Sequence, residues 1–360
     1  MTEKTLKDKT ATIISMPTLA SHNEEKKVNN KISNRQRVSK TCKEPSPPPT
    51  TQNPAEAPEI TSWVRALSGQ DGPVLITGET GTGKSALGRR IHDLSCRAGK
   101  ILIVRGCGEF DAGTVEAQLF GHSCDAYTGA ITEQDGVFKM ADGGTLILDD
   151  IDYLPKSIQT RLLRFLDDGT YYRLGQADQP RRSNVRLIVT TNKDLMELHI
   201  KGQFLADLYY RLSHWKINLP PLRSRPDVVK RLSNEFLVRF DEKRGTPPRA
   251  FTQDVVNLLA FMPWRGNVRE LKSTVENIAL LCASAERVID IGQAASSLLD
   301  ERLLHDSGGI PLLPDMSVDE RIFRVLAITN WNISLTSRIV GVSRTTVHDR
   351  ISKRGWSKPV

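Results

Sequence analysis

Hydrophobic residues between positions 58 and 225 gather in short runs, and the stretches between these runs have helical spacing. The runs are rich in valine, isoleucine and leucine, and they are VLITG (74–78), ILIV (101–104), TLILDD (145–150) and VRLIVTTN (185–192). Continuous apolar runs that alternate with helical stretches are typical of parallel strands buried on both faces. The pattern predicts an α/β subdomain over residues 58–225, with a parallel sheet flanked by helices.

The rest of the chain has helical periodicity. Residues 226–304 contain VVNLLAFM (255–262) and VRELKSTVENIALLC (268–282), which predict a helical subdomain. Residues 305–316, HDSGGIPLLPDM, are expected to be a linker. Residues 317–360 predict a compact all-α module in which a turn containing Gly341 joins two helices, with Ser343 as the N-cap of the second. The residues expected on the buried face of the module's first helix are Val318, Ile322, Val325, Leu326 and Thr329.

Residues 1–57 are polar, rich in lysine and nearly free of aromatic residues, and they lead into KEPSPPPTTQNPAEAPE (43–59). Such a segment buries too little apolar surface to offset the entropy of ordering it, so a disordered arm is expected. The stretch ATIISMPTLA (11–20) faintly resembles a secretory signal, but Pro17 interrupts it. No apolar run is long enough to span a membrane, and a cytoplasmic protein is expected.

The segment GETGTGKS matches the phosphate-loop pattern G-x-x-x-x-G-K-[ST], with an apolar run before it and a helical stretch after it. Its residues are Gly78, Glu79, Thr80, Gly81, Thr82, Gly83, Lys84 and Ser85. The glycines let successive N–H groups point at phosphate oxygens, and the helix N-terminus adds its dipole. Lys84 is expected to reach the β- and γ-phosphates of ATP, and Ser85 to offer an oxygen to Mg²⁺. The alternative is a glycine-rich turn that matches by chance.

Polar residues end the third and fourth apolar runs, TLILDD (145–150) and VRLIVTTN (185–192). Asp149 is placed to bind Mg²⁺, and Asp150 to orient or deprotonate the attacking water. Asn192, at the end of VTTN (189–192), is a candidate sensor of the γ-phosphate. Taken singly, an Asp-Asp pair after a strand could be a simple turn, so the order and spacing of these residues carry the prediction.

The charge and the cysteines narrow the choice of partners. The net charge is +8, and residues 331–360 hold six lysine or arginine residues against one acid, Asp349, which favours an anionic partner for this end. The five cysteines are odd in number and include no CxxC pair, so neither zinc nor a disulfide framework is expected. They are Cys42, Cys96, Cys107, Cys124 and Cys282.

From about residue 60 to 300, the chain resembles the AAA+ domain of bacterial sigma-54-dependent transcription activators, also called enhancer-binding proteins. The matching stretches are VLITGETGTGKSALGRRIH, LFGHSCDAYTGA, GGTLILDDID, DLYYRL, LPPLRSR and WRGNVREL. The resemblance implies a hexameric ring with ATP bound between subunits, and a helical AAA+ lid over residues 226–304. It also implies a loop whose tip, here Tyr127, Thr128 and Gly129, contacts sigma-54 when ATP turns over. The alternative for Tyr127 is a core aromatic residue of a hairpin.

Two arginines take roles from the same resemblance. Arg211 in DLYYRL falls where the family places an arginine finger that reaches a neighbouring subunit's γ-phosphate. Arg269 in WRGNVREL matches the lid arginine that reports the state of the nucleotide. Each could instead be an ordinary partner in a surface salt bridge.

The sequence departs from the family pattern at four positions. Asp150 stands where glutamate is usual and is one methylene shorter. Gly106 replaces an asparagine that holds the catalytic acid, and Leu205 replaces a first interfacial arginine. Asp125 replaces the first glycine of the loop. The sequence therefore does not decide whether the protein hydrolyses ATP without a partner subunit. A paralogous subunit could supply the missing arginine in a mixed ring.

The C-terminal module resembles the Fis-type helix-turn-helix that ends this activator family, which implies binding to double-stranded DNA at an upstream enhancer. The residues expected to contact DNA are Arg344, Thr345, Thr346, His348 and Arg350. The alternative is a three-helix packing module with a solvated basic face. Only the arm precedes the ATPase, so no receiver domain is expected, as in the Hrp-type regulators that the chain also resembles.

The leading hypothesis is an ATP-driven activator that remodels sigma-54 RNA polymerase from an enhancer. The main alternative is a DNA-bound regulator or partner subunit that binds ATP without hydrolysing it. A third, an unrelated AAA+ enzyme such as a helicase loader, is disfavoured by YTGA (127–130) and by the terminal module.

Overall fold

The structure is a computed structural model. It describes residues 58–111, 113–124, 126, 132–176, 178–282, 287–300 and 316–358. The expected disordered arm (1–57) and nearly all of the expected linker (305–316) lie outside these residues, as do Tyr127, Thr128 and Gly129.

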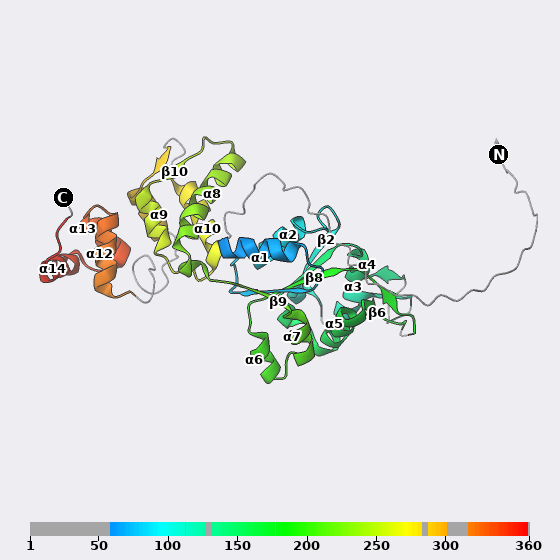
Figure 1. Cartoon of the computed structure of the whole chain (residues 1–360). Coiled ribbons are helices and arrows are strands. Elements are labelled where there is room, and N and C mark those ends of the chain that lie inside the picture. The colour runs from blue at the N-terminus through cyan, green and yellow to red at the C-terminus, as the bar shows by residue number, and fades with distance from the viewer. Residues whose placement is uncertain are drawn as a thin grey trace, which may run out of the picture. The chain divides into compact units, whose positions relative to one another are not determined.

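Five parallel strands form the central sheet in the order β2-β5-β8-β1-β9 (Figure 1). They are β1 (Val74–Gly78), β2 (Leu102–Gly106), β5 (Thr145–Asp149), β8 (Arg186–Thr191) and β9 (Trp215–Leu219). The first four confirm the strands predicted from the apolar runs. Strand β9 was not predicted from the sequence, because exposed Lys216 and Asn218 alternate with its apolar residues and no continuous run forms.

Alternate residues of the strands pack into two separate hydrophobic clusters, one on each face of the sheet. In β5, Ile147 joins one cluster, while Leu146 and Leu148 join the other, as the two-residue period of a strand requires. Each of these fully buried side chains contributes about 1.5–3 kcal/mol of transfer free energy. The sheet is therefore the middle layer of a three-layer α/β unit.

Helices cover both faces of this sheet. Helices α1 (Pro58–Ser68) and α2 (Lys84–Asp93) pack on the face of Ile147. The opposite face is covered by α3 (Val115–Phe120), α4 (Val137–Met140), α5 (Lys156–Asp168), α6 (Leu195–Ile200) and α7 (Ala206–Leu212). Figure 1 shows α1 and α2 on one side of the strands and α5 and α7 on the other.

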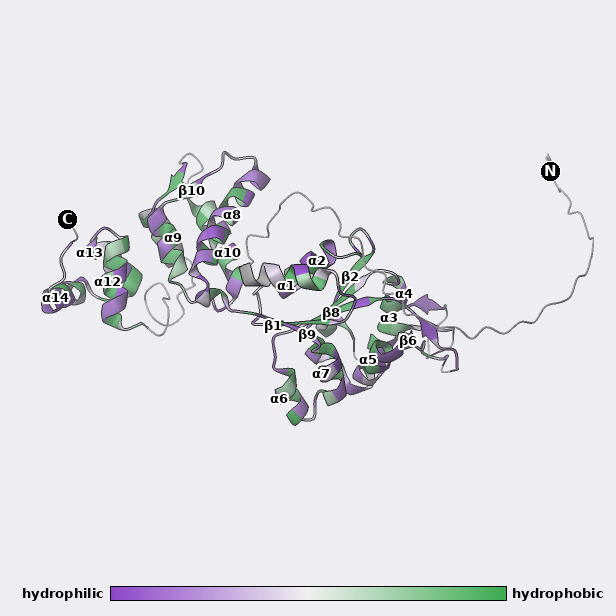
Figure 2. Cartoon of the chain, viewed as in Figure 1, coloured by the Kyte–Doolittle hydropathy of each residue, from purple (hydrophilic) through white to green (hydrophobic). Residues whose placement is uncertain are grey.

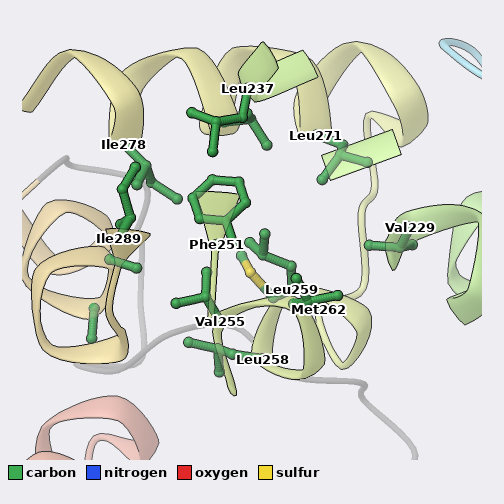
Figure 3. Packing of buried hydrophobic residues seen from close by; sticks show 14 of the residues in the cluster. Val229, Leu237, Phe251, Val255, Leu258, Leu259, Met262, Leu271, Ile278 and Ile289 are labelled. Atoms are coloured by element: carbon green, nitrogen blue, oxygen red, sulfur yellow. The ribbon is translucent and has the colours of Figure 1, made fainter. Parts of the chain in front are cut away.

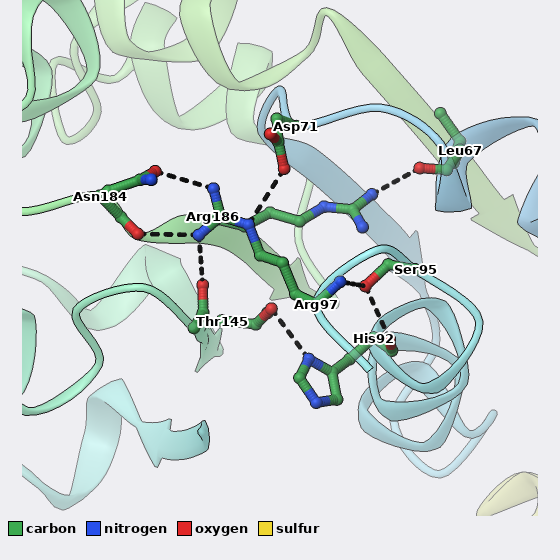
Figure 4. Close-up of polar contacts among 9 residues, drawn as sticks. Leu67, Asp71, His92, Ser95, Arg97, Thr145, Asn184 and Arg186 are labelled. Carbon is green, nitrogen blue, oxygen red and sulfur yellow. Dashed lines mark hydrogen bonds and ion pairs between the residues drawn. The ribbon is translucent and has the colours of Figure 1, made fainter. Parts of the chain in front are cut away.

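A buried polar network holds the N-terminal ends of β5 and β8 in place (Figure 4). The Arg97 guanidinium donates to the carbonyl oxygens of Gly144 (2.7 Å) and Asn184 (2.8 Å) and pairs with Asp71 at 3.0 Å. Fully buried Arg186 donates to the Leu67 carbonyl at 2.6 Å. These bonds tie α1 and the segment after α2 to the strands, at the end opposite the strand termini that carry Asp149 and Asn192.

A helical subdomain follows the sheet. Its elements are α8 (Pro226–Arg244), β10 (Ala250–Phe251), α9 (Gln253–Ala260), α10 (Asn267–Leu281), β11 (Val288–Ile289) and α11 (Ile291–Asp300). Figure 3 shows Leu237, Phe251, Val255 and Leu271 packed in its core, where fully buried Trp264 donates its indole N–H to the Leu259 carbonyl at 2.8 Å. Figure 2 shows green and purple residues alternating along α8 and α10, as expected for helices with one buried face. The predicted helical lid is confirmed.

Three helices form the C-terminal module: α12 (Val318–Ile328), α13 (Ile333–Val340) and α14 (Arg344–Arg354). The Ser343 hydroxyl accepts the Thr346 N–H at 3.0 Å, so the expected N-cap forms, and Gly341 ends α13 with a φ of +74°. Ile322, Leu326 and Val347 are buried together. Val318 was wrongly placed on the buried face: as the first residue of α12 it is 46% exposed, before the helix reaches its neighbours.

None of the helices in the described ranges is long and apolar enough to cross a membrane. Within the same ranges, no cluster of three or more histidine, cysteine, aspartate or glutamate side chains has the geometry to hold a metal ion.

Candidate functional site

The phosphate loop joins the end of β1 to the start of α2. All three of its glycines have positive φ: Gly78 (+149°), Gly81 (+80°) and Gly83 (+99°). Residues with a Cβ rarely adopt these angles, so the sequence pattern is a requirement of the backbone path. The loop thus presents its N–H groups at the N-terminus of α2, where the helix dipole favours an anion.

Lys84 and Ser85 are the first two residues of α2. The Lys84 ammonium lies inside the loop, donating to the carbonyl oxygens of Gly78 (2.9 Å) and Glu79 (3.1 Å). Burial lowers the pKa of Lys84, while the carboxylates of Asp150 and Asp149 act against this shift. The amine is therefore held next to the acids at the end of β5.

Asp149 and Asp150 lie at the carboxyl end of β5. The Thr190 hydroxyl donates to the Asp149 carboxylate at 3.0 Å and accepts the Asp150 N–H at 3.3 Å. Asp150 has a φ of +55°, so the chain turns sharply at this residue into a short 3₁₀ helix, η2 (Ile151–Tyr153). Burial raises the pKa of Asp150, against the opposing charge of Lys84. A carboxylate with a raised pKa is a better proton acceptor.

Asn192 follows β8 and donates its amide N–H to the Thr80 hydroxyl of the phosphate loop at 2.9 Å. The structure thus brings Asn192 together with the loop, as expected from the adjacency of β8 and β1 in the sheet. Ligands of open α/β sheets bind at this edge, where the carboxyl ends of the strands meet.

A third acid, which was not predicted from the sequence, lies beside this pair. The Asp152 side chain is fully buried, accepts the Thr191 hydroxyl at 2.8 Å and pairs with Lys193 at 2.9 Å. Asp152 raises the pKa of Asp150. Its position two residues after Asp150 was the only signal in the sequence.

Gly106 ends β2 directly opposite Asp149 in the parallel register. A Cβ at position 106 would lie 2.8 Å from a carboxylate oxygen of Glu109, in the 3₁₀ helix η1 (Cys107–Glu109). The space that an asparagine would need is therefore filled by the end of the Glu109 side chain. Burial raises the pKa of the Cys107 thiol strongly, and Asp149 and Asp150 add to the shift.

The two arginines with expected roles lie in different places. Arg269, on α10, is exposed. Its positive charge lowers the pKa of both Lys84 and Asp150, so Arg269 lies near the phosphate loop. Arg211, on α7, is exposed and pairs with Asp167 at 3.3 Å, with a second bond to the Leu166 carbonyl at 3.1 Å. Within one subunit, Arg211 is thus held by the end of α5 and not by the phosphate loop.

Leu205 caps α7 and is only partly exposed. Its side chain packs against the hydrophobic core, and its N–H donates to the Gln159 side chain at 2.9 Å. An arginine at this position would therefore have to leave the core contact.

The stretch LFGHSCDAYTGAITEQDGVF (119–138) emerges from a short antiparallel pair, β3 (Gly121–His122) and β4 (Gln134–Asp135). Arg173 bonds to Asp135 at the base of this stretch, and the Ser123 N–H donates to the Leu174 carbonyl at 3.0 Å. The base of the predicted sigma-contact loop is thus clamped to the segment after β6 (Thr170–Tyr171). Its tip lies outside the described residues.

A cavity of about 460 Å³ lies beside this base and apart from the phosphate loop. Its lining residues are Phe120, Arg161, Arg164, Thr170, Tyr171, Tyr172, Arg173, Gly175 and Asp178.

The expected DNA-contact residues of α14 do not share one environment. Arg344, Thr345 and His348 are exposed, whereas Thr346 is half-buried at the N-cap. Arg350 is also half-buried, because its guanidinium pairs with Asp319 of α12 at 3.1 Å. Arg350 therefore faces the neighbouring helix, at the side of α14 that packs.

Comparison with known proteins agrees with this geometry. Residues 51–218 match the family model of the sigma-54 interaction domain, and residues 223–305 match that of an AAA+ ATPase lid domain. The chain is 40% identical over 232 residues to the alginate biosynthesis transcriptional regulatory protein AlgB of Pseudomonas aeruginosa, covering 64% of this chain and 51% of that protein. It is 34% identical over 302 residues to the formate hydrogenlyase transcriptional activator FhlA of Escherichia coli, covering 83% of this chain and 43% of that protein.

A third relative, the transcriptional regulatory protein ZraR of Salmonella typhimurium, is 35% identical over 293 residues, or 81% of this chain and 65% of that protein. The chain thus spans roughly half the length of the curated relatives it matches. Among solved structures, NtrX from Brucella abortus in complex with ADP superimposes with a TM-score of 0.62 at 24% identity, covering 83% of this chain and 68% of that one. NtrX in complex with ATP gives a TM-score of 0.59 at 23% identity, over 87% and 70%.

Proposed function

The chain belongs to the family that carries the sigma-54 interaction domain joined to an AAA+ lid, and from this premise we propose that it is an ATP-driven activator of sigma-54-dependent transcription. The observation that carries the proposal is the meeting of Lys84, Asp149, Asn192 and Arg269 around one phosphate loop. The relatives named above are transcriptional regulators and activators, which supports the same function.

Each of these residues has its own role in ATP hydrolysis. The loop N–H groups and Lys84 bind the phosphates, and Asn192 contacts the γ-phosphate end. Asp150, with its raised pKa, accepts the proton of the attacking water. Arg269 adds positive charge from the lid, where it stabilises the charge that develops on the transferred phosphoryl group.

Mg²⁺ fits the oxygen ligands present. Ser85 and Asp149 offer hard oxygens at the loop, and Mg²⁺ usually takes one or two protein ligands together with substrate phosphates and water. When bound, Mg²⁺ neutralises charge on the β- and γ-phosphates.

The active form is a ring, by inference a hexamer, in which exposed Arg211 leaves Asp167 and reaches the ATP of the neighbouring subunit. Leu205 removes a second arginine from that interface, so a paralogous subunit is the natural source of the missing charge. If Leu205→Arg gives no gain in ATPase activity and the protein alone hydrolyses ATP at a rate typical of other sigma-54 activators, the mixed ring is rejected.

The tip residues Tyr127, Thr128 and Gly129 contact sigma-54. The C-terminal module (317–360), as a Fis-type helix-turn-helix, binds double-stranded enhancer DNA through Arg344, Thr345 and His348. The subdomain boundaries at residues 225 and 304 follow from the sequence pattern. The protein acts where polymerase and promoter DNA are, in the cytoplasm.

The test is open-complex formation at a sigma-54 promoter with purified polymerase. Open complexes are expected with hydrolysable ATP and not with a non-hydrolysable analogue, and Lys84→Ala is expected to abolish them. Full activity with the analogue would reject the ATP-driven mechanism. Binding of the wild type to linear enhancer DNA, unchanged by Lys84→Ala, serves as the folding control.

A further inference from the structure

Glu79 occupies a position of the phosphate-loop pattern that can hold any residue, yet here it is tightly engaged. Its carboxylate accepts two hydrogen bonds from the Arg223 guanidinium, each of 2.7 Å, and one from the Asn267 amide at 3.2 Å. The Arg223 bonds lower the pKa of Glu79 most, burial acts in the opposite direction, and Asn267 adds to the lowering. A two-pronged, charge-assisted pair of this kind is among the stronger polar contacts in proteins.

Both partners of Glu79 come from the lid side of the molecule. Arg223 lies in the 3₁₀ helix η3 (Leu222–Ser224), immediately before α8. Asn267 is the first residue of α10, is fully buried, and has a φ of +54°, so its backbone is held in a turn that few residues adopt. The phosphate loop is thus hydrogen-bonded to the segment before α8 and to the first residue of α10.

Asn267 makes this junction with every polar atom of its side chain. Its amide N–H groups donate to Glu79 and to the Thr80 carbonyl at 3.0 Å, and its oxygen accepts the Leu222 N–H at 2.8 Å. A buried amide with all three bonds made is strongly oriented. Asn267 therefore fixes the loop, η3 and α10 relative to one another.

The backbones of the lid and the loop also touch. The Val268 N–H donates to the Gly81 carbonyl at 2.9 Å. A Cβ at Gly81 would collide with the Gly266 carbonyl oxygen, so only glycine permits this approach. The first turn of α10 consequently rests on the phosphate loop itself.

We propose that Glu79, Arg223 and Asn267 form a latch that holds the first turn of α10 on the phosphate loop and so positions Arg269 over the nucleotide. Arg269 lies two residues after Asn267, and its charge reaches both Lys84 and Asp150. The three latch residues are positioning residues, since they act through Arg269. The inference rests on the proposed binding of ATP.

The latch is expected to control nucleotide affinity more than global stability. The Glu79 and Arg223 side chains are each 41% exposed, so solvent screens the ion pair and limits what it adds to folding. The loss of one partner instead frees the first turn of α10 and lets Arg269 move. We expect Glu79→Gln and Arg223→Gln each to raise the Kd for ATP by about tenfold.

The experiment is a double-mutant cycle on the full chain, read by binding of a fluorescent ATP analogue with Mg²⁺. The double variant Glu79→Gln/Arg223→Gln is expected to bind about as weakly as each single variant, and not about a hundredfold more weakly than wild type. Arg269→Ala is expected to weaken binding in the wild type and to add little in the Glu79→Gln background. Glu197→Gln, which removes an exposed pair between Glu197 of α6 and Lys201 just after this helix, is the matched control and is expected to bind like wild type.

Amide hydrogen exchange without nucleotide gives a second, independent measurement. The Val268 N–H is expected to exchange about ten times faster in Glu79→Gln than in wild type or Glu197→Gln. Additive effects in the cycle, or unchanged exchange at Val268, would overturn the latch. If wild type binds no ATP and equals Lys84→Ala, the proposed function fails, and the exchange measurement still decides the latch.

Discussion

A buried ion pair joins Asp241 and Arg249 in the lid, and its removal is expected to destabilise this subdomain. Asp241 is fully buried in α8, and the Arg249 side chain is 3% exposed. Arg249 donates to the carboxylate from its guanidinium at 2.7 Å and from its backbone N–H at 2.9 Å. It also donates to the Cys282 carbonyl at 3.2 Å, which connects α8 with the end of α10.

Asp241→Asn keeps the size of the side chain but removes its charge. The Arg249 guanidinium then stays buried without a counter-ion, and breaking a buried pair in this way costs about 3–5 kcal/mol. The matched control is Glu276→Gln, because Glu276 pairs with Lys272 on the lid surface at 3.9 Å. An exposed pair of this spacing is worth only about 0.3–0.5 kcal/mol.

Urea unfolding of the full chain labelled with fluorotryptophan measures this difference. Fluorine NMR of Trp264, which is fully buried in the lid, reports the unfolding of that subdomain, and its signal is assigned by Trp264→Phe. If Asp241→Asn destabilises the lid no more than Glu276→Gln does, the reasoning about the buried pair is wrong. The double change Asp241→Leu/Arg249→Met should recover most of the loss, since a well-packed apolar pair can replace a buried ion pair.

The same pair predicts a pH dependence. Burial raises the pKa of Asp241, but the hydrogen bonds from Arg249 outweigh it, so the pKa lies below its ordinary value of 3.8. A carboxyl group whose pKa is lower in the folded than in the unfolded state stabilises the fold at pH values above its unfolded-state pKa. This stabilisation is lost as the pH falls through the folded-state pKa. The gap between wild type and Asp241→Asn should therefore be constant near neutral pH and shrink below about pH 3.8.

Three further predictions concern function. Asp150→Glu extends the carboxylate towards the position usual in the family. It should raise the ATPase kcat, by up to about a hundredfold if the carboxylate of Asp150 lies about 1 Å out of place. An unchanged kcat would show that Asp150 already reaches the attacking water. Thr128→Ala should leave the ATPase rate intact while abolishing complex formation with sigma-54, and a parallel loss of both would contradict a contact role. Arg344→Ala should weaken enhancer binding and lower the slope of log affinity against log salt by about one, as measured by DNA titration, if Arg344 contacts a phosphate; an unchanged slope would exclude that contact.

Much of the fold could be predicted because its signals are local. Four apolar runs became strands of one parallel sheet, since strands buried on both faces need continuous hydrophobic residues. The glycines of the phosphate loop were recognisable because only glycine adopts their positive φ freely. Strand β9 was missed for the opposite reason, because its polar residues Lys216 and Asn218 break the run.

Residue types alone did not reveal which polar side chains meet. Arg350 was expected to contact DNA from its place in the helix, and its ion pair with Asp319 of another helix had no signal in the sequence. Glu109 carried no signal, but its carboxylate fills the space beside Gly106 next to Asp149. These contacts depend on how elements pack, and helical or strand periodicity does not encode them.

The sequence by itself determined the phosphate loop, the acids after β5 and the order of sheet and lid, because each follows from a few neighbouring residues. Only the tertiary structure decided that Glu79 is held by Arg223 and Asn267, which lie 144 and 188 positions further along the chain. No local pattern can specify a contact across such a separation. It forms because the packed sheet and lid bring the phosphate loop and the start of α10 to the same place.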